Sequence, residues 1–299
     1  MQRARSLVGG LVLGAMSLAA CSPQRQAAPA RAELSPAASG TVVASAPSAS
    51  APSSASVASV APAVDDDSGF TELEVDGYKP SLVFVPHPGR AAPVIIVTHG
   101  AGGRPEPHCK RYRELAGDSA FLLCTAGRTI DVHQAPEQRR YFYDGHQELG
   151  REVVAALQAL EARYGERVDP ERRIFAGYSQ GATMGILALE QGVAASAKIR
   201  RILLVEGGSH EWNIAIANRL HEDGVDRVAI VCGQTSCREA QEQSVRWMKK
   251  GGLDVRPSYA PGAGHTYEGT VAPLVDDAFA WLVDDDPRFA GRERTVSAD

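Results

Sequence analysis

Apolar runs that alternate with amphipathic stretches constrain the fold of this chain more than any other feature of its sequence. The runs are continuous rather than interrupted by a polar residue at every second position, which is typical of parallel strands covered on both faces. They lie at residues 93–98, 121–124, 173–176, 202–205, 228–231 and, more weakly, 255–259. Stretches with helical spacing separate them, at 144–164, 180–191, 212–221, 237–250 and 271–283. The pattern predicts an α/β fold, with a mostly parallel central sheet flanked by helices on both faces.

Local signals predict how some of these elements begin and end. An antiparallel pair is expected at the start of the domain, formed by residues 73–75 and 82–85 on either side of an Asp-Gly turn. In the first long helix, Asp144 is placed to serve as the N-cap and Gly165 to end the helix.

The first 68 residues are not expected to belong to this domain. Two arginines precede a short apolar run that ends at residue 20, which is typical of an export signal peptide and too short for a membrane span. Residues 21–68 are rich in Ala, Ser and Pro and cannot bury enough apolar surface to fold, so we interpret them as a flexible tether. A single domain at 69–289 and a tail at 290–299 complete the predicted organisation.

The end of the signal peptide carries a second pattern. Its Leu-Ala-Ala-Cys sequence at 18–21 resembles the lipobox of bacterial lipoproteins. The resemblance implies cleavage before Cys21, lipidation of its thiol and a location in the bacterial cell envelope, with the domain outside the cytoplasm. Ser22 favours the outer membrane. We expect membrane contact through this lipid anchor only.

Charge and cysteine content limit the partners and the compartment. The net charge is −5 and no basic patch is interleaved with aromatic residues, so nucleic acid is not an expected partner. Beyond Cys21 there are four cysteines, an even number that favours disulfides in an oxidising compartment. Pairing of neighbours would join Cys109 to Cys124 and Cys232 to Cys237, although other connectivities remain open. His99, His108 and Cys109 do not have the spacing of metal ligands, and no metal site is predicted.

Three glycine-containing segments follow predicted strands. Gly-Tyr-Ser-Gln-Gly at 177–181 lies between a strand and a helix, where a sharp turn would raise the hydroxyl of Ser179 above the sheet. His-Gly-Ala-Gly-Gly at 99–103 follows the strand at 93–98, and Gly-Ala-Gly-His at 262–265 follows the last strand. Ligands of such sheets bind beyond the carboxyl ends of the strands, where all three segments fall.

These segments and the order of the strands resemble the α/β-hydrolase superfamily, in particular small esterases of the dienelactone-hydrolase type without a lid domain. The resemblance extends from about residue 82 to 282 and implies Ser179 as nucleophile and His265 as general base. It also implies an oxyanion hole formed by the backbone amides of Ala101, or Gly102, and Gln180. The chemistry requires no cofactor.

The acid of the triad departs from the family pattern. The usual aspartate after the strand at 228–231 is missing, because the chain reads Cys-Gly-Gln-Thr-Ser-Cys there. Glu206, directly after the preceding strand, is the first candidate for the acid. Glu239 and Glu242 come second, and the amide oxygen of Gln234 is a weaker means of orienting the histidine.

Two hypotheses about function follow. The first is a serine hydrolase that cleaves carboxylic esters, in small molecules or polymers, through an acyl-enzyme. The second is a binding or sensor lipoprotein that kept the scaffold and lost catalysis along with the aspartate. The position of Glu206 relative to His265 distinguishes them.

Overall fold

The computed structural model of the chain describes residues 69–87 and 91–290. The predicted signal peptide, Cys21, the tether and the tail after residue 290 lie outside the described residues. None of the helices in the described part is long and apolar enough to cross a membrane.

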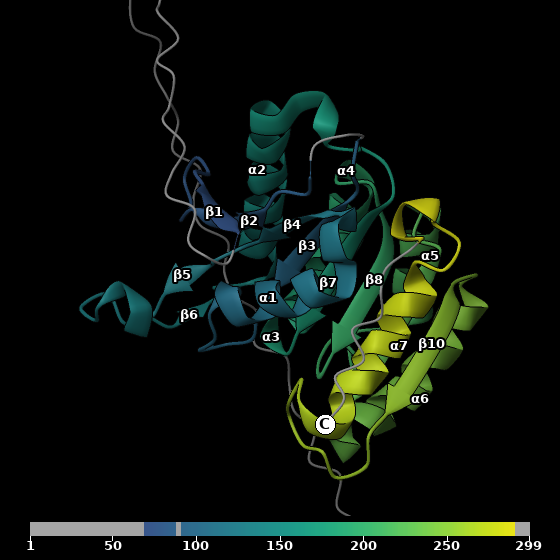
Figure 1. Cartoon of the computed structure of the whole chain (residues 1–299). Helices are drawn as coiled ribbons and strands as arrows, with labels where there is room; N and C mark the ends of the chain where they lie inside the picture. Colours follow the sequence, from purple (N-terminus) through teal and green to yellow (C-terminus); the bar gives the residue numbers. More distant parts are fainter. Residues whose placement is uncertain (1–68, 88–90, 291–299) are drawn as a thin grey trace, which may run out of the picture. The chain divides into compact units, whose positions relative to one another are not determined.

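An eight-stranded sheet forms the centre of the domain, in the order β1-β2-β4-β3-β7-β8-β9-β10 (Figure 1). The strands are β1 (Phe70–Leu73), β2 (Ser81–Phe84), β3 (Val94–Thr98), β4 (Phe121–Cys124), β7 (Arg173–Tyr178), β8 (Ile199–Val205), β9 (Arg227–Cys232) and β10 (Asp254–Tyr259). β2 pairs antiparallel with both β1 and β4, and all the other pairs are parallel. The predicted mostly parallel sheet and its antiparallel opening are therefore confirmed, although the first strand lies at Phe70–Leu73 and not at 73–75.

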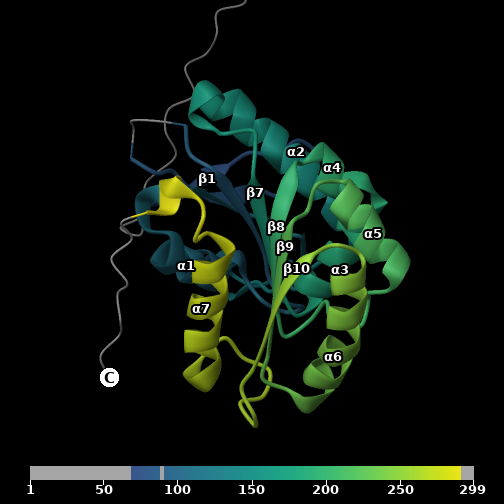
Figure 2. The same ribbon diagram turned by 90° about the vertical axis from the view of Figure 1, so that its right-hand side faces the viewer.

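Helices cover both faces of the sheet, as the continuous apolar strands predicted (Figure 2). One face carries α1 (Pro105–Ala116) and α7 (Ala272–Leu282); the other carries α2 (His146–Tyr164), α3 (Gln180–Ala188), α5 (Ile214–Glu222) and α6 (Thr235–Lys250). In β3, Val94 and Ile96 join the core beneath α2 and α3, whereas Ile95 and Val97 join the core beneath α1 and α7. Because both faces of the strand are buried, the residues that point to either face are apolar.

Two predicted helix boundaries were wrong. Asp144 is not an N-cap: its carboxylate lies 3.1 Å from the guanidinium of Arg128, and α2 begins at His146 after Gly145. The helix expected over residues 180–191 is shorter. α3 ends at Ala188, and the chain passes through a wide turn at Leu189–Val193, where Gly192 takes a φ of 100°, into a last helical turn, α4 (Ala194–Ser196). The predicted end of α2 at Gly165 is confirmed.

Two features were not predicted. α1 starts at Pro105, a favoured first helical position, and no helix was expected between the strands at 93–98 and 121–124. A two-stranded ribbon of β5 (Arg128–Thr129) and β6 (Tyr141–Phe142) projects from the domain between β4 and α2 (Figure 1).

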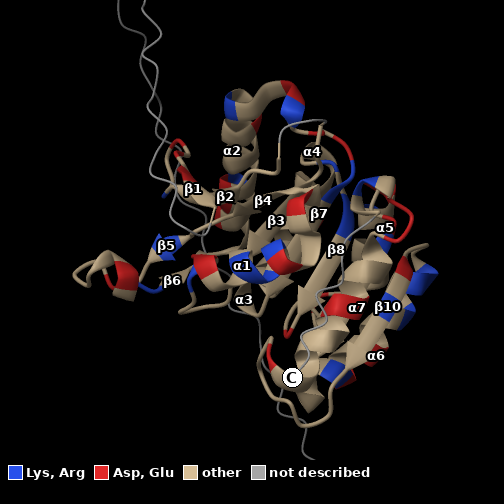
Figure 3. Ribbon diagram, viewed as in Figure 1, with Lys and Arg blue, Asp and Glu red and all other residues tan. Residues whose placement is uncertain are grey.

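On α1 and α2, basic and acidic residues occur together (Figure 3).

Candidate active site

Ser179 occupies a sharp turn between β7 and α3. Its φ of 50° and ψ of −115° are unusual for a residue with a side chain. The glycines on either side are required by close packing. A Cβ on Gly177 would lie 2.6 Å from the Cα of Ala182, and one on Gly181 would lie 2.6 Å from the carbonyl oxygen of His99. The strand-to-helix turn predicted from the 177–181 sequence is therefore present, with Ser179 at its apex.

His265 lies beside this serine. Its Nε2 is 2.8 Å from Oγ of Ser179, although the two residues are 86 positions apart in the chain. Ser179 follows β7 at the centre of the sheet, whereas His265 is on the loop after β10 at the edge. The carboxyl ends of parallel strands meet at one edge of a sheet, which brings the two side chains together.

Two side chains face the other ring nitrogen of His265. Oε1 of Gln234 lies 3.0 Å from Nδ1, within hydrogen-bond distance, and Oε2 of Glu206 lies 3.5 Å from the same atom. Glu206 follows β8 and Gln234 follows β9, which are the next two strands beside β7. Both sequence candidates are thus brought to the histidine, with the amide nearer than the carboxylate.

The other two candidates for the acid lie elsewhere. Glu239 and Glu242 are on the exposed side of α6, where Glu242 pairs with Arg238.

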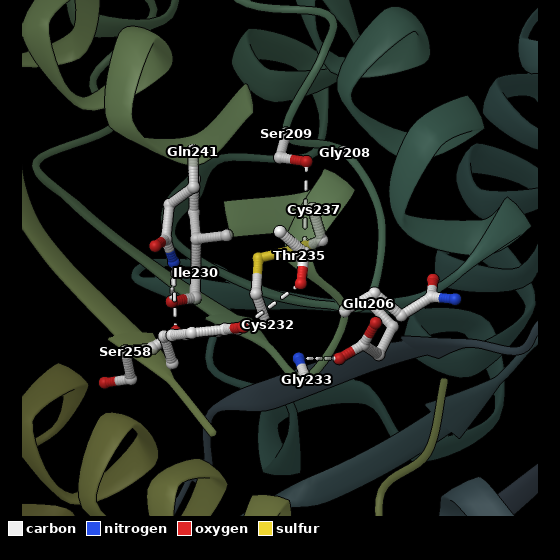
Figure 4. The surroundings of a disulfide bond; sticks show 12 residues. Glu206, Gly208, Ser209, Ile230, Cys232, Gly233, Thr235, Cys237, Gln241 and Ser258 are labelled. Carbon is white, nitrogen blue, oxygen red and sulfur yellow. Dashed lines mark hydrogen bonds between the residues drawn. A yellow bond between two sulfur atoms is a disulfide. The ribbon is translucent and has the colours of Figure 1, made fainter. Parts of the chain in front are cut away.

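The carboxylate of Glu206 is completely buried, and only one of its two oxygens accepts a hydrogen bond. Burial raises its pKa, while the amide hydrogen bond from Gly233 and the nearby His265 act in the opposite direction. Gly233 donates its backbone N–H to Oε1 of Glu206 (Figure 4). Oε2, the oxygen nearest the histidine, has no hydrogen-bond partner among the described residues. A buried carboxylate in this position would gain most from a positive charge on the imidazole.

The loop after β3 lies against Ser179, because a Cβ on Gly100 would be 3.1 Å from the Cβ of Ser179. Gly102 donates its N–H to the carbonyl of Tyr141, and Gly103 donates to the carbonyl of Gly100. The N–H of Gly102 is therefore already used in a hydrogen bond and is not free to bind an oxyanion. The amides of Ala101 and Gln180 make no hydrogen bond within residues 69–87 and 91–290. Of the two alternatives for the first oxyanion donor, the structure leaves Ala101 available.

Side chains behind this loop fix its shape. Both ring nitrogens of the buried His99 lie 2.8 Å from a carbonyl oxygen, those of Gly100 and Ala126. The side-chain amide of Gln180 accepts from the backbone N–H of Tyr143 at 3.0 Å and donates to its carbonyl at 3.1 Å. The glycine loop, the elbow and the segment leading out of β6 are thus held together.

An aromatic cluster beside the serine was missed from the sequence. The rings of Tyr178 and Tyr267 stack with centroids 4.5 Å apart, and His108 packs against both at 5.1 Å. The hydroxyl of Tyr178 donates to the carbonyl of His265 at 3.0 Å. Burial, and secondly the charge of Glu206, raises the pKa of Tyr178 to about 12, so it remains a donor. Burial, and secondly the neighbouring His99, lowers the pKa of His108 to about 4.

The four cysteines of the domain form two disulfides. Cys109 on α1 is bonded to Cys124 at the end of β4, and Cys232 at the end of β9 is bonded to Cys237 on α6. This is the pairing of neighbours expected from the sequence. The second disulfide lies close to Glu206, as Figure 4 shows.

Two expectations about the surroundings of the site concern metals and a lid. The described residues contain no group of three or more His, Cys, Asp or Glu side chains placed to hold a metal ion. The connection from β8 to β9, all of it described, contains α5 and no lid domain.

No protein-family model matches the sequence, and a search of curated proteins finds no match. Solved structures do match. A dienelactone hydrolase from Anabaena variabilis superposes with a TM-score of 0.52 at 15% identity, over 72% of this chain and 96% of its own. A dienelactone hydrolase-like promiscuous phosphotriesterase from metagenomic libraries gives 0.51 at 16% identity, over 71% and 97%.

A third match is an uncharacterized protein from Bacillus cereus, with a TM-score of 0.52 at 16% identity over 67% of this chain, which spans 62% of that protein. Likenesses at such low identity concern the fold alone. Together with the strand order, the two helical layers and the turn at Ser179, they identify the architecture: the chain has the α/β-hydrolase fold.

Proposed function

We propose that this protein is a serine hydrolase that cleaves carboxylic esters through an acyl-enzyme on Ser179. The observation that carries the proposal is the 2.8 Å contact between Oγ of Ser179 and Nε2 of His265, made at the apex of the strand-to-helix turn. A serine hydroxyl is a weak nucleophile until an adjacent base accepts its proton, and this contact provides the base.

The groups around Ser179 then have distinct roles in the proposed reaction. Nε2 of His265 takes the hydroxyl proton as Oγ attacks the ester carbonyl, and returns that proton to the leaving alkoxide. The amides of Ala101 and Gln180 stabilise the oxyanion of the tetrahedral intermediate. Water activated by His265 then releases the acid and regenerates Ser179.

We assign the acid to Glu206 and an orienting role to Gln234. The Gln234 amide oxygen is within hydrogen-bond distance of Nδ1 and would fix the proton on that nitrogen. The buried Glu206 carboxylate supplies the negative charge that favours the imidazolium during proton transfer. The family's single aspartate would thus be replaced by two side chains from neighbouring strand ends.

One observation favours the alternative, a binding or sensor protein without catalysis. The Glu206 carboxylate approaches Nδ1 only to 3.5 Å, and the uncharged Gln234 occupies the closer position. A domain that had lost its charge relay would keep a serine–histidine contact without an activated nucleophile.

Labelling with a fluorophosphonate probe separates the two functions. We expect the purified chain to gain one probe per molecule by intact mass, and Ser179→Ala to gain none while its circular dichroism matches that of the wild type. A folded, oxidised wild-type protein that is not labelled would refute the hydrolase and support the binding protein. A panel of activated carboxylic esters of increasing size then addresses the substrate class, and phosphotriesters serve as the comparison.

We also propose that the domain is exported and anchored to the cell envelope through lipid on Cys21, with the outer membrane as the expected location. The support is the sequence of residues 1–22. Metabolic labelling with an alkyne fatty acid should mark the wild-type chain and not Cys21→Ala, and membrane fractionation identifies the location. Equal labelling of both would contradict the proposal.

A further inference from the structure

The loop between Cys232 and Cys237 adjoins the proposed charge relay. It joins the last residue of β9 to the first turn of α6, and the disulfide closes it across a Cα–Cα distance of 5.6 Å (Figure 4). Cys232 is completely buried and Cys237 is 6% exposed, whereas the residues at 234–236 are exposed. The disulfide therefore holds the two buried ends of the loop together, while the residues between them face solvent.

Three hydrogen bonds connect this loop with Glu206, Gly264 and His265. The backbone N–H of Gly233 donates to Glu206, and the carbonyl of Gly233 accepts from the amide of Gly264 at 3.4 Å. The side chain of Gln234 meets Nδ1 of His265 at 3.0 Å. One short loop thus touches the acid Glu206, the base His265 and Gly264, the residue before the base.

The packing at Gly233 leaves little room for the loop to move. A Cβ at this position would lie 2.4 Å from the carbonyl oxygen of Gly264 and 2.9 Å from Oε1 of Glu206. A displacement of the loop toward either neighbour is therefore transmitted to the relay, and a displacement away from them removes the Gly233 hydrogen bond.

Outside the backbone hydrogen bonds that Arg238 donates to Gln234 at 3.1 Å and Ala260 donates to Cys232 at 2.8 Å, the loop has few other contacts. Gln234 is the N-cap residue of α6, but its side chain makes no capping bond and is used on His265 instead. Ser209 donates weakly to Sγ of Cys237 at 3.8 Å, and Thr235 lies 3.4 Å from the hydroxyl of Tyr259. The disulfide adds a covalent cross-link between the two ends of the loop.

We propose that the Cys232–Cys237 disulfide is a positioning element of the charge relay, which holds Gly233 and Gln234 at the distances that Glu206 and His265 require. This inference rests on the proposed hydrolase function. The Cys109–Cys124 disulfide is the matched control, because it joins α1 to β4 and neither of its cysteines forms a hydrogen bond with Ser179, His265 or Glu206.

The test compares Cys232→Ala/Cys237→Ala with Cys109→Ala/Cys124→Ala. Both are measured by the second-order rate of fluorophosphonate labelling and by kcat on an activated ester, at a temperature where circular dichroism shows them folded. We expect a loss of tenfold or more in the first variant and less than twofold in the control. Equal rates in the first variant and the wild type would overturn the proposal.

A double-mutant cycle separates positioning from general destabilisation. If the disulfide acts by holding the loop against Glu206 and His265, its removal in a Glu206→Gln/Gln234→Ala background should cost less than threefold, because both groups that it positions are already absent. A loss of tenfold in both backgrounds would mean an independent structural effect and would contradict the inference.

Two further outcomes are distinguishable. If the wild type itself is not labelled, the proposed function fails and this inference fails with it. If the Cys232→Ala/Cys237→Ala variant does not fold, the remaining disulfide of the Cys109→Ala/Cys124→Ala variant is reduced with a water-soluble phosphine. The phosphine takes oxygen from water and becomes the phosphine oxide, and the disulfide becomes two thiols, which are counted by alkylation and mass. Activity should fall in proportion to the thiols formed, and full activity after complete reduction would refute the role.

Discussion

Replacing Glu206 with glutamine removes one negative charge from the site and little else. The side chain is buried and keeps an oxygen for the Gly233 amide, so the packing should be retained. At 3.5 Å, unit charges on the carboxylate and on a protonated His265 attract by about 5 kcal/mol at an effective dielectric constant of 20. Because the side chain of His265 is 38% exposed, solvent screening reduces this interaction.

We therefore expect Glu206→Gln to raise the barrier by about 2 to 4 kcal/mol, which is roughly a 30- to 1,000-fold loss in kcat. The loss should fall on kcat rather than KM, since the imidazolium forms only as the proton is transferred. The assay is steady-state hydrolysis of an activated ester, with Gln234→Ala as the comparison that keeps the charge. A folded Glu206→Gln enzyme with kcat within threefold of the wild type would refute the assignment of the acid, and a larger loss in Gln234→Ala would transfer the role to the amide.

Three other predictions test neighbouring features. Tyr178→Phe removes the hydrogen bond to the carbonyl of His265 and should lower kcat about fivefold, the equivalent of about 1 kcal/mol, with KM changed less than twofold; an unchanged kcat would show that the hydroxyl does not position the histidine. Burial raises the pKa of Glu152 to about 7, against hydrogen bonds from the amides of Gly127 and Ala126. The folded state therefore binds this proton more tightly than the unfolded state, and stability should fall by about 3 kcal/mol as pH rises from 4.5 to above 7. Urea denaturation should show that Glu152→Gln flattens this dependence, and an equal slope in both proteins would contradict it. Removal of the Cys109–Cys124 disulfide, which spans 15 residues, should lower the free energy of unfolding by about 3 kcal/mol, more than the roughly 2 kcal/mol for the Cys232–Cys237 loop of 5; the reverse order would exclude a chain-entropy effect as the main cause.

The fold could be predicted from the sequence because burial on both faces leaves a continuous apolar pattern in each central strand. The turn at Ser179 was also predictable, since it combines a strand, two glycines and a helix within a short segment. Short elements leave weaker signals. The two-residue strands at Arg128–Thr129 and Tyr141–Phe142 are too brief to show a period, and they were missed.

The groups around His265 depend on the spatial order of the strands, which no local pattern contains. Glu206 and Gln234 were recognised as candidates, but their relative distances follow from the adjacency of β7, β8 and β9. The stacking of Tyr178 on Tyr267 joins residues that are far apart in the chain, and a single tyrosine beside a serine carries no signal of it.

The placement of His265 after β10 has a consequence for biogenesis. β10 is both the last strand to be synthesised and the outermost strand on its side of the sheet, paired only with β9. A nascent chain can assemble the elbow, the glycine loop and the Glu206 turn before the histidine has emerged. Its serine would remain without a base until then, so the proposed hydrolase would acquire activity only as its final strand docks. A chain truncated before residue 254 would remain inactive even with its first seven sheet strands formed.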